Sequence, residues 1–107
     1  MAARRRSPAF IFAALGDETR LGIVARLSSG QPHSISELTR GSRLTRQAIT
    51  KHLRVLEKAG IVHGFQTGRE SRFEFEPGAV DEMREYLDFV SSQWDLALSR
   101  LKHFVED

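Results

Sequence analysis

The sequence predicts one mostly α-helical domain that carries a single small β-hairpin. Three observations support this fold class. Through most of the 107 residues, apolar side chains recur every three or four positions, as on one face of an α-helix. After Gly60 they alternate with polar residues over two short runs, as in paired β-strands. Residues 79–105 contain no Pro or Gly and continue the helical pattern almost to the end of the chain.

The composition fits a soluble, folded protein, with 40% apolar and 28% charged residues. The length suits one domain spanning residues 1–107. No apolar run is long enough to cross a membrane and no signal peptide is visible, so we expect no membrane partner and a cytoplasmic location. There are no cysteines, which excludes disulfides and thiolate metal ligands.

Charge is distributed unevenly along the chain. Residues 1–72 carry 13 Lys and Arg against 5 Asp and Glu, whereas residues 73–107 carry 3 against 9. A basic front and an acidic back are often only two solvated surfaces. Here the basic excess coincides with the helix at residues 44–62, and we therefore expect this part of the chain to meet a polyanion.

The first two helices follow a basic arm at residues 1–6 that we expect to be disordered. Ser7 and Pro8 suit the N-cap and first position of a helix that is apolar nearly all round, so more than one surface must cover it. Gly16 ends this helix. Asp17 caps a second helix that runs to about residue 29. The expected inner face of that helix is Leu21, Val24 and Leu27, with Ile23 alongside.

A short third helix begins at Ser34, after a loop at residues 31–33. Ser34 and Glu37 have the spacing of a capping box, in which each side chain bonds the other residue's backbone N–H. Residues 41–43 then turn the chain into the stretch 44–62. A short capped helix, a glycine-bearing turn and a second helix make a helix-turn-helix.

Residues 44–62 predict a basic helix with one apolar and one polar face. Thr45 is placed to be its N-cap, Leu44 and Ile49 have the spacing of a hydrophobic staple, and Gly60 ends it. Ile49, Leu53 and Leu56 face the core. The opposite face carries long donors, an amide and hydroxyls, which are the groups that bind phosphates and base edges. The predicted DNA contacts here are Thr45, Arg46, Gln47, Thr50, Lys51 and Arg54.

These side chains suit different parts of a duplex. Gln47 fits an adenine edge, Thr50 a thymine methyl or a polar edge, and either Lys51 or Arg46 a guanine. Arg54 is expected to bind a phosphate.

The hairpin follows directly. Ile61, His63 and Phe65 alternate in one run, Phe73 and Phe75 in the next, and residues 67–71 form the turn. Arginines on small hairpins often serve solubility alone. Because this hairpin follows a basic helix, however, we predict that it is the wing of a winged helix-turn-helix. The predicted fold has about five helices and a two-stranded wing. We predict phosphate contacts from Arg69 and Arg72.

The last helix, residues 79–105, carries an unbroken heptad seam of apolar residues: Val80, Met83, Leu87, Val90, Trp94, Ala97, Leu101 and Phe104. At 1.5 Å per residue it is roughly 40 Å long, more than so small a domain covers by itself. The first half of the seam could be an intramolecular core stripe. Over its whole length we expect it to pair with a second copy, and burial would contribute about 2 kcal/mol for each large side chain. The predicted homodimer contacts on the first and last helices are Phe10, Phe12, Leu87, Val90, Trp94, Ala97, Leu101 and Phe104.

Three segments resemble the ArsR-type winged-helix transcription regulators: LGDETRLGIVARL, SISELTRGSRLTRQAITKHLRVLEKAGIV and GRESRFEF. The resemblance covers about residues 10–75. It implies a homodimer, formed through the first and last helices, that binds a palindromic DNA operator and represses transcription. It also implies base contacts from Gln47, Thr50 and Lys51. We interpret His52, within the HLRVL segment, as a packing or hydrogen-bonding residue.

The sequence departs from the metal-sensing members of this family. The thiolate site would need cysteines around residues 37–40, where there are none. The site on the last helix would need an Asp-x-His pair near Val90 and Ser92, which cannot bind metal, so His103 and Glu106 remain weak candidates for half of a site. His33 and His63 are expected to be isolated loop and strand surface residues. We predict no cofactor; the effector could be a small molecule, a partner protein, or nothing.

A winged helix without DNA binding could act as a protein-protein interaction module through the heptad helix, but such modules usually lose the outward basic face that this chain keeps. An enzyme is not expected, because no nucleophile–base arrangement or phosphate-cradling loop is present. Glu74 and Glu76 share one strand face and are expected to face solvent.

Overall fold

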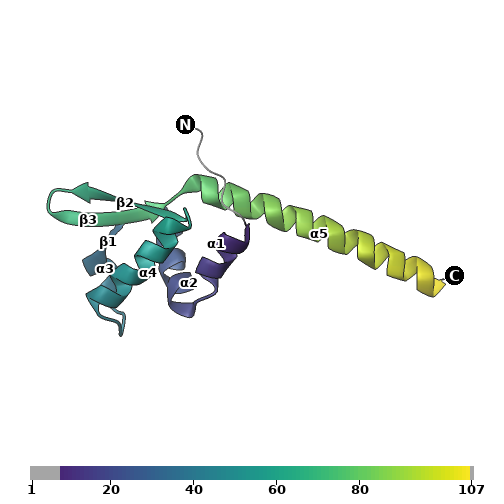
Figure 1. The fold of residues 1–107 in the computed structure, drawn as a ribbon, viewed down its shortest axis with the longest axis horizontal. Helices are drawn as coiled ribbons and strands as arrows, with labels where there is room; N and C mark the ends of the chain where they lie inside the picture. The colour runs from purple at the N-terminus through teal and green to yellow at the C-terminus, as the bar shows by residue number, and fades with distance from the viewer. Residues whose placement is uncertain (1–7, 107) are drawn as a thin grey trace.

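The computed structural model describes residues 8–106, so the predicted arm at residues 1–6 and the predicted N-cap Ser7 lie outside the described part. Helices pack around a small antiparallel sheet, and the last helix leaves this body (Figure 1). The predicted mostly helical fold with five helices and a wing is confirmed. In chain order the elements are α1 (Pro8–Leu15), α2 (Glu18–Leu27), β1 (His33–Ser34), α3 (Ile35–Thr39), α4 (Arg46–Lys58), β2 (Val62–Thr67), β3 (Glu70–Phe75) and α5 (Pro77–Glu106).

The first four helices, the base of the sheet and the first turn of α5 contribute to one hydrophobic core. Burial of each of its large aliphatic side chains contributes roughly 1.5–3 kcal/mol. Its largest fully buried side chains are Ile11, Leu27, Leu38, Ile49, Leu53, Leu56, Ile61 and Val62.

The predicted inner face of α2 was wrong at one position. Leu21 is 50% exposed, whereas Ile23 and Leu27 are buried. Ile23 and Leu27 stand four residues apart and share one face of the helix, with Val24 packed at its edge. Leu21 lies two residues before Ile23, about 200° around the helix at 3.6 residues per turn, and therefore points away from the core.

The sheet has three strands rather than the expected two, in the order β1-β3-β2. His33 and Ser34, predicted as a loop and a cap, pair with Phe73 and Arg72 of β3. The prediction was wrong for His33 because a segment of two residues is too short to show an alternating pattern. These residues form a strand only because they pair with β3. Ser34 keeps its predicted capping role as well.

The hairpin of β2 and β3 depends on two glycines. Gly68 has a φ of +61° in the turn between the strands, which favours a residue without a Cβ. Gly64 lies opposite Phe73 in the register. A Cβ on Gly64 would lie 2.7 Å from Cε2 of Phe73, so the aromatic ring packs directly over the glycine.

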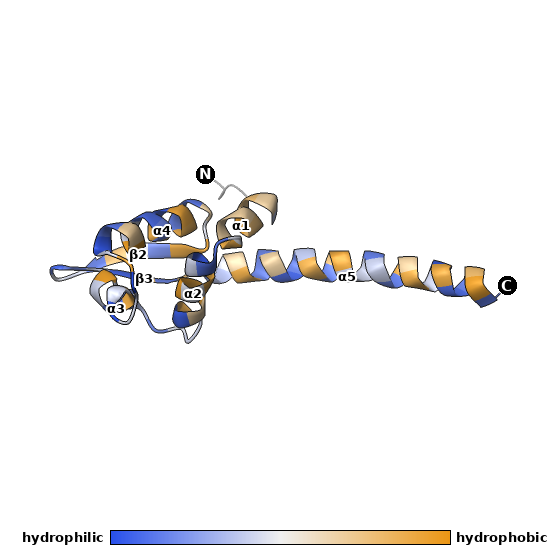
Figure 2. Cartoon of the chain, turned by 90° about the horizontal axis from the view of Figure 1, so that it is seen from below, coloured by the Kyte–Doolittle hydropathy of each residue, from blue (hydrophilic) through white to orange (hydrophobic). Residues whose placement is uncertain are grey.

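Helix α5 begins at Pro77, two residues earlier than predicted, because proline suits the first position of a helix. It has 30 residues and is therefore about 45 Å long. It projects from the body and gives the molecule a long dimension of 67 Å. Bands of apolar residues follow its whole length (Figure 2). None of the helices within residues 8–106 is long and apolar enough to cross a membrane.

Candidate nucleic-acid interface

Helix α4 is fixed at both ends and along its inner face. Thr45 is the N-cap, and its hydroxyl oxygen accepts a hydrogen bond from the backbone N–H of Ala48 at 3.2 Å. Gly60, with a φ of +78°, terminates the helix. Ile49, Leu53 and Leu56 are 0–1% exposed, as predicted. The burial of this stripe determines which residues of α4 point outward.

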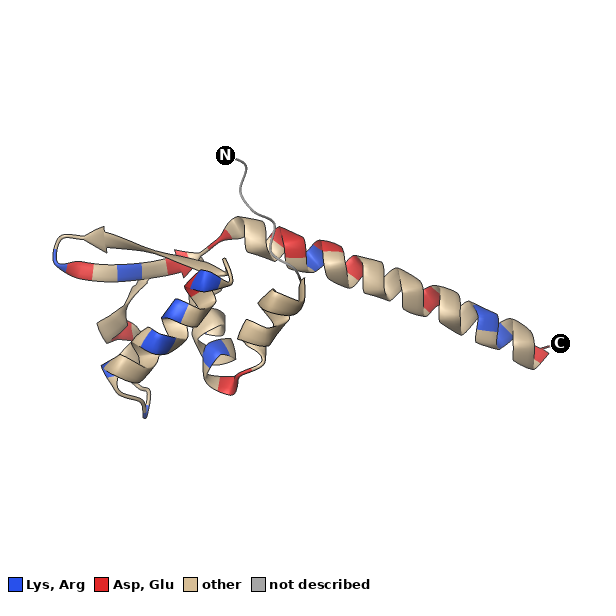
Figure 3. Cartoon of the chain, in the orientation of Figure 1, with Lys and Arg blue, Asp and Glu red and all other residues tan. Residues whose placement is uncertain are grey.

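The outward face of α4 carries the side chains that the sequence assigned to DNA. Thr45, Arg46, Gln47, Lys51 and Arg54 are exposed. Thr50 is half-buried, and its hydroxyl donates a hydrogen bond to the backbone oxygen of Arg46 at 2.7 Å. A DNA contact from Thr50 would therefore use its methyl group or its oxygen as an acceptor. Basic residues recur along α4 and at the turn of the hairpin (Figure 3).

Two arginines of this face have protein partners. Arg46 Nη1 donates a hydrogen bond to the hydroxyl of Ser36 in α3. Arg54 lies 3.9 Å from a carboxylate oxygen of Glu57, but its side chain remains 74% exposed. Such an exposed pair contributes little stability, so Arg54 is free to bind a phosphate.

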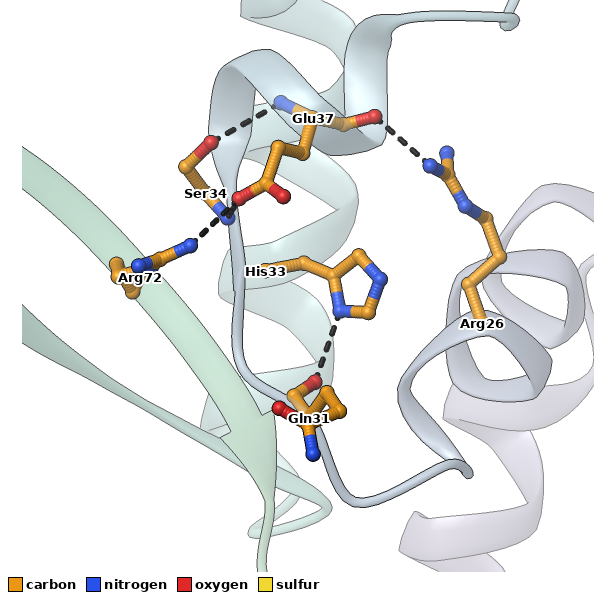
Figure 4. A network of polar contacts seen from close by, with 6 residues as sticks. All are labelled: Arg26, Gln31, His33, Ser34, Glu37 and Arg72. Atoms are coloured by element: carbon orange, nitrogen blue, oxygen red, sulfur yellow. Dashed lines mark hydrogen bonds and ion pairs between the residues drawn. The ribbon is translucent and has the colours of Figure 1, made fainter.

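Helix α3 has only five residues and is held at both ends by side chains (Figure 4). At its start Glu37 N–H donates to Ser34 Oγ at 3.0 Å and Ser34 N–H donates to Glu37 Oε1 at 2.9 Å, which confirms the predicted capping box. At its end the Arg26 guanidinium of α2 donates to the backbone oxygens of Glu37 at 2.8 Å and Leu38 at 2.9 Å. No local pattern in the sequence indicates this role of Arg26, which belongs to another helix.

The same Glu37 carboxylate ties the wing to α3. Arg72 Nη2 of β3 lies 2.7 Å from Glu37 Oε1. The backbone hydrogen bond from Ser34 and then the Arg72 guanidinium lower the pKa of Glu37 from 4.5 to about 2. Arg72 was predicted to bind a phosphate; its side chain is 29% exposed and is already paired. Its buried Nε has no hydrogen-bond partner among residues 8–106.

A second polar network fixes α4 against α2. Arg20 Nε donates to the backbone oxygen of Ala14 at 2.5 Å, and Arg20 Nη1 lies 3.2 Å from His52 Nδ1. A guanidinium can only donate, so this ring nitrogen accepts. Asp17 caps α2, because its carboxylate accepts a hydrogen bond from the backbone N–H of Arg20 at 3.0 Å. This hydrogen bond is the main reason that the pKa of Asp17 is lowered. His52 is thus a hydrogen-bonding residue, as predicted.

His63 at the base of the wing is not the isolated surface residue that was expected. Its Nε2 lies 2.9 Å from Glu74 Oε1 and its Nδ1 lies 3.0 Å from Glu76 Oε2. Glu74 and Glu76, expected only to face solvent, are therefore engaged. The cross-strand register places His63 opposite Glu74, and that register could not be fixed from the sequence. His33 Nδ1 contacts the backbone oxygen of Gln31 at 2.8 Å.

No metal site is formed within residues 8–106, where no group of three or more His, Asp or Glu side chains could hold an ion. The two weak candidates, His103 and Glu106, are exposed on the last turns of α5. Two ligands at this spacing do not complete four-coordination for zinc.

The residues predicted to form a dimer lie on two surfaces of this single chain. On α1, Phe12 is half-buried, with its ring centroid 5.7 Å from that of Tyr86 in α5. Val90 is half-buried and Ala97 exposed. The other large apolar members are exposed as follows: Phe10 46%, Leu87 54%, Trp94 64%, Leu101 58% and Phe104 83%.

Comparisons with known proteins agree with this geometry. A family model described as a helix-turn-helix domain matches residues 15–64. The HTH-type transcriptional regulator Rv2034 of Mycobacterium tuberculosis is 36% identical over 101 residues, covering 94% of this chain and 91% of the relative. The uncharacterized HTH-type transcriptional regulator YuzN of Bacillus subtilis is 45% identical over 65 residues, covering 55% of this chain and 71% of the relative.

Solved structures extend the match to the whole fold. An ArsR-like transcriptional regulator from Rhodococcus sp. RHA1 matches with a TM-score of 0.79 and 35% sequence identity. The match covers 92% of this chain and 89% of the Rhodococcus chain. The ArsR family transcriptional regulator RHA00566 has a TM-score of 0.75 at 28% identity, covering 89% and 97%.

A winged helix-turn-helix whose recognition helix, here α4, has an exposed basic face is typical of a DNA-binding transcriptional regulator. The chain belongs to the ArsR family of helix-turn-helix regulators. This confirms the predicted family and the expectation that the protein is not an enzyme.

Proposed function

We propose that this single-domain chain acts as a homodimeric repressor that binds a palindromic operator. The observation that carries the proposal is the orientation of α4, whose apolar stripe is buried and whose polar side chains are exposed beside the wing. Side chains presented in this way by the second helix of a helix-turn-helix enter a major groove.

Sequence readout is assigned to the N-terminal half of this face. Gln47 bonds an adenine edge, Thr50 contacts a thymine methyl, and Lys51 bonds a guanine. Arg54 and Arg69 are exposed and anchor phosphates. Thr45 adds a contact at the start of the helix. Arg72 is the least available of the predicted contacts because Glu37 already pairs with it.

Dimerisation is assigned to α1 and α5. Exposed aromatic and aliphatic side chains continue along α5 far beyond the body of the same chain. Contiguous apolar surface of this kind marks an interface. An antiparallel or parallel pairing of two α5 helices would bury the seam, and Phe10 and Phe12 would complete the surface. Two recognition helices would then meet successive major grooves about 34–36 Å apart.

Binding to DNA is tested by selecting duplexes from a random pool with the full chain, followed by titration of the selected operator and an unrelated duplex. We expect a clear preference for a palindrome. The double substitution Gln47→Ala with Thr50→Ala should abolish that preference while leaving binding to the unrelated duplex nearly unchanged. Unaltered discrimination by this variant would mean that α4 does not read the sequence.

The exposed apolar surface of α5 also favours a second candidate, an interaction module that docks another protein. Failure of the full chain to bind any duplex at low salt, together with a defined partner protein on α5, would support that candidate. Repression is tested separately with a reporter gene placed behind the selected operator. Reporter output should fall when the chain is expressed, and a rise would indicate activation.

A further inference from the structure

A polar cleft lies between α3, α4 and the turn of the wing. Its volume is about 180 Å³, and Ser34 and Ile35 form part of its wall. A water molecule occupies roughly 30 Å³ in the liquid, so the cleft has room for a tetrahedral oxyanion group. The side chains available to a ligand come from three elements: Ser36 of α3, Arg46 of α4, and Arg69, Glu70 and Ser71 of the wing.

The chemistry of the cleft favours an anion. The charged residues of its lining are two arginines, Arg46 and Arg69, and one glutamate, Glu70, which leaves a net positive charge. Ser36 Oγ accepts a hydrogen bond from Arg46, so its own hydroxyl proton is available to a ligand. Ser71 donates to Gln66 Oε1 across 3.4 Å, a weak bond that a ligand can replace.

The position of Arg46 also changes its expected role. Arg46 is the first residue of α4, and its guanidinium is drawn toward Ser36 at the wall of the cleft. A side chain that reads guanine must extend both donors along the base edge in the groove. The hydrogen bond to Ser36 holds the Arg46 guanidinium toward α3 at the cleft instead, and leaves base readout to Gln47, Thr50 and Lys51.

We propose that this cleft is a binding site for one phosphodiester group of the DNA backbone, with Arg46 and Arg69 contacting the same phosphate and Ser36 and Ser71 donating to it. The inference rests on the proposed DNA binding and specifies part of it. Because α4 and the wing supply the two arginines, the phosphate joins them and sets their register on the duplex. Arg46 is then a positioning residue for DNA and does not read a base.

The test compares the selected operator with an unrelated duplex, using the full chain and fluorescence anisotropy over a series of salt concentrations. Arg46→Gln should lower the affinity for both duplexes by the same factor and leave the base preference unchanged. It should also reduce the slope of log affinity against log salt by about 0.9 for each protomer. Ser36→Ala should lower both affinities with the slope nearly unchanged, because it removes a donor but no charge.

Three further variants test the proposal. Arg46→Gln combined with Arg69→Gln should cost less than the sum of the two single changes, since both bind one phosphate. Glu70→Gln should raise the affinity for both duplexes, since it removes the opposing carboxylate. Arg100→Gln, an exposed arginine on α5 far along the chain from the wing, is the matched control and should leave the slope unchanged.

The outcomes separate this inference from the proposed function. If the wild-type chain binds no duplex at low salt, the proposed DNA binding fails. If it binds, but Arg46→Gln alters the preference at one base pair or leaves the salt slope intact, only the cleft proposal is overturned. If inorganic phosphate binds the wild type but not Arg46→Gln in the absence of DNA, while Arg46→Gln leaves the affinity for both duplexes unchanged, the cleft is a free-anion site and the phosphodiester assignment is wrong.

Discussion

The guanidinium of Arg72 lies 2.7 Å from the carboxylate of Glu37, and this contact joins β3, the central strand of the sheet, to α3, the first helix of the helix-turn-helix. The same carboxylate oxygen accepts the backbone N–H of Ser34 at 2.9 Å. One acidic residue therefore caps α3 and also holds the wing against it.

Glu37→Gln should make stability less dependent on pH in the acid range. Because the pKa of Glu37 is lowered from 4.5 to about 2, its charged form stabilises the folded state. That contribution is fully present above about pH 4.5 and is lost as the pH falls through about 2. The measurement is urea unfolding between neutral and acid pH, at one protein concentration. Asp95→Asn, on the exposed part of α5, is the control and should follow the wild type; identical acid profiles for Glu37→Gln and the wild type would contradict the assignment.

Arg26→Ala should destabilise the chain through the end of α3. The guanidinium donates to the backbone oxygens of Glu37 and Leu38 at 2.8 and 2.9 Å. These carbonyls lie in the last turn of α3, where no following turn supplies backbone N–H donors. Because Arg26 is exposed, water can replace part of these hydrogen bonds. We therefore expect a loss of about 1 kcal/mol in the free energy of unfolding. Arg26→Lys should be intermediate because lysine cannot donate from two fixed nitrogens. No loss in the alanine variant would show that these bonds exchange freely with water.

Gly64→Ala should destabilise the hairpin. The added Cβ would lie 2.7 Å from Cε2 of Phe73, a residue that is 7% exposed and whose ring therefore has little room to shift. Overpacking of this kind costs about 1–3 kcal/mol, visible as a lower thermal midpoint. The matched control is Gly22→Ala in α2, where a Cβ meets nothing within 4 Å. That change should raise stability by about 0.5–1 kcal/mol, because alanine favours a helix more than glycine does. A neutral Gly64→Ala would mean that the ring moves aside.

Trp94→Ala should weaken self-association if the heptad seam is the dimer interface. Trp94 is 64% exposed on the single chain, and a tryptophan at the centre of an interface typically costs at least about 2 kcal/mol when truncated. The dissociation constant measured by sedimentation equilibrium should then rise about thirtyfold or more. Phe89→Ala is the comparison, since Phe89 is 60% exposed but lies off the seam. A larger effect from Phe89 than from Trp94 would move the interface to the other face of α5.

A good part of this molecule follows from local sequence. The caps Asp17, Ser34 and Thr45 and the terminating Gly60 are each identified by chemistry within four residues, and all four have the predicted role. The buried stripe of α4 follows from a period of 3.6 residues, and it fixes which side chains of that helix face outward.

Tertiary structure decided what depends on residues far apart in the chain. The strand at His33 exists only because β3 pairs with it, and Leu21 is exposed because α2 turns its Ile23–Leu27 face to the core. The partners of Arg72, Arg46 and His63 all come from other elements of the chain or from across the hairpin. Local patterns specify caps, periods and turns because those interactions span a few residues. Which arginine pairs with a carboxylate and which stays open to DNA is set only when helices and strands pack together.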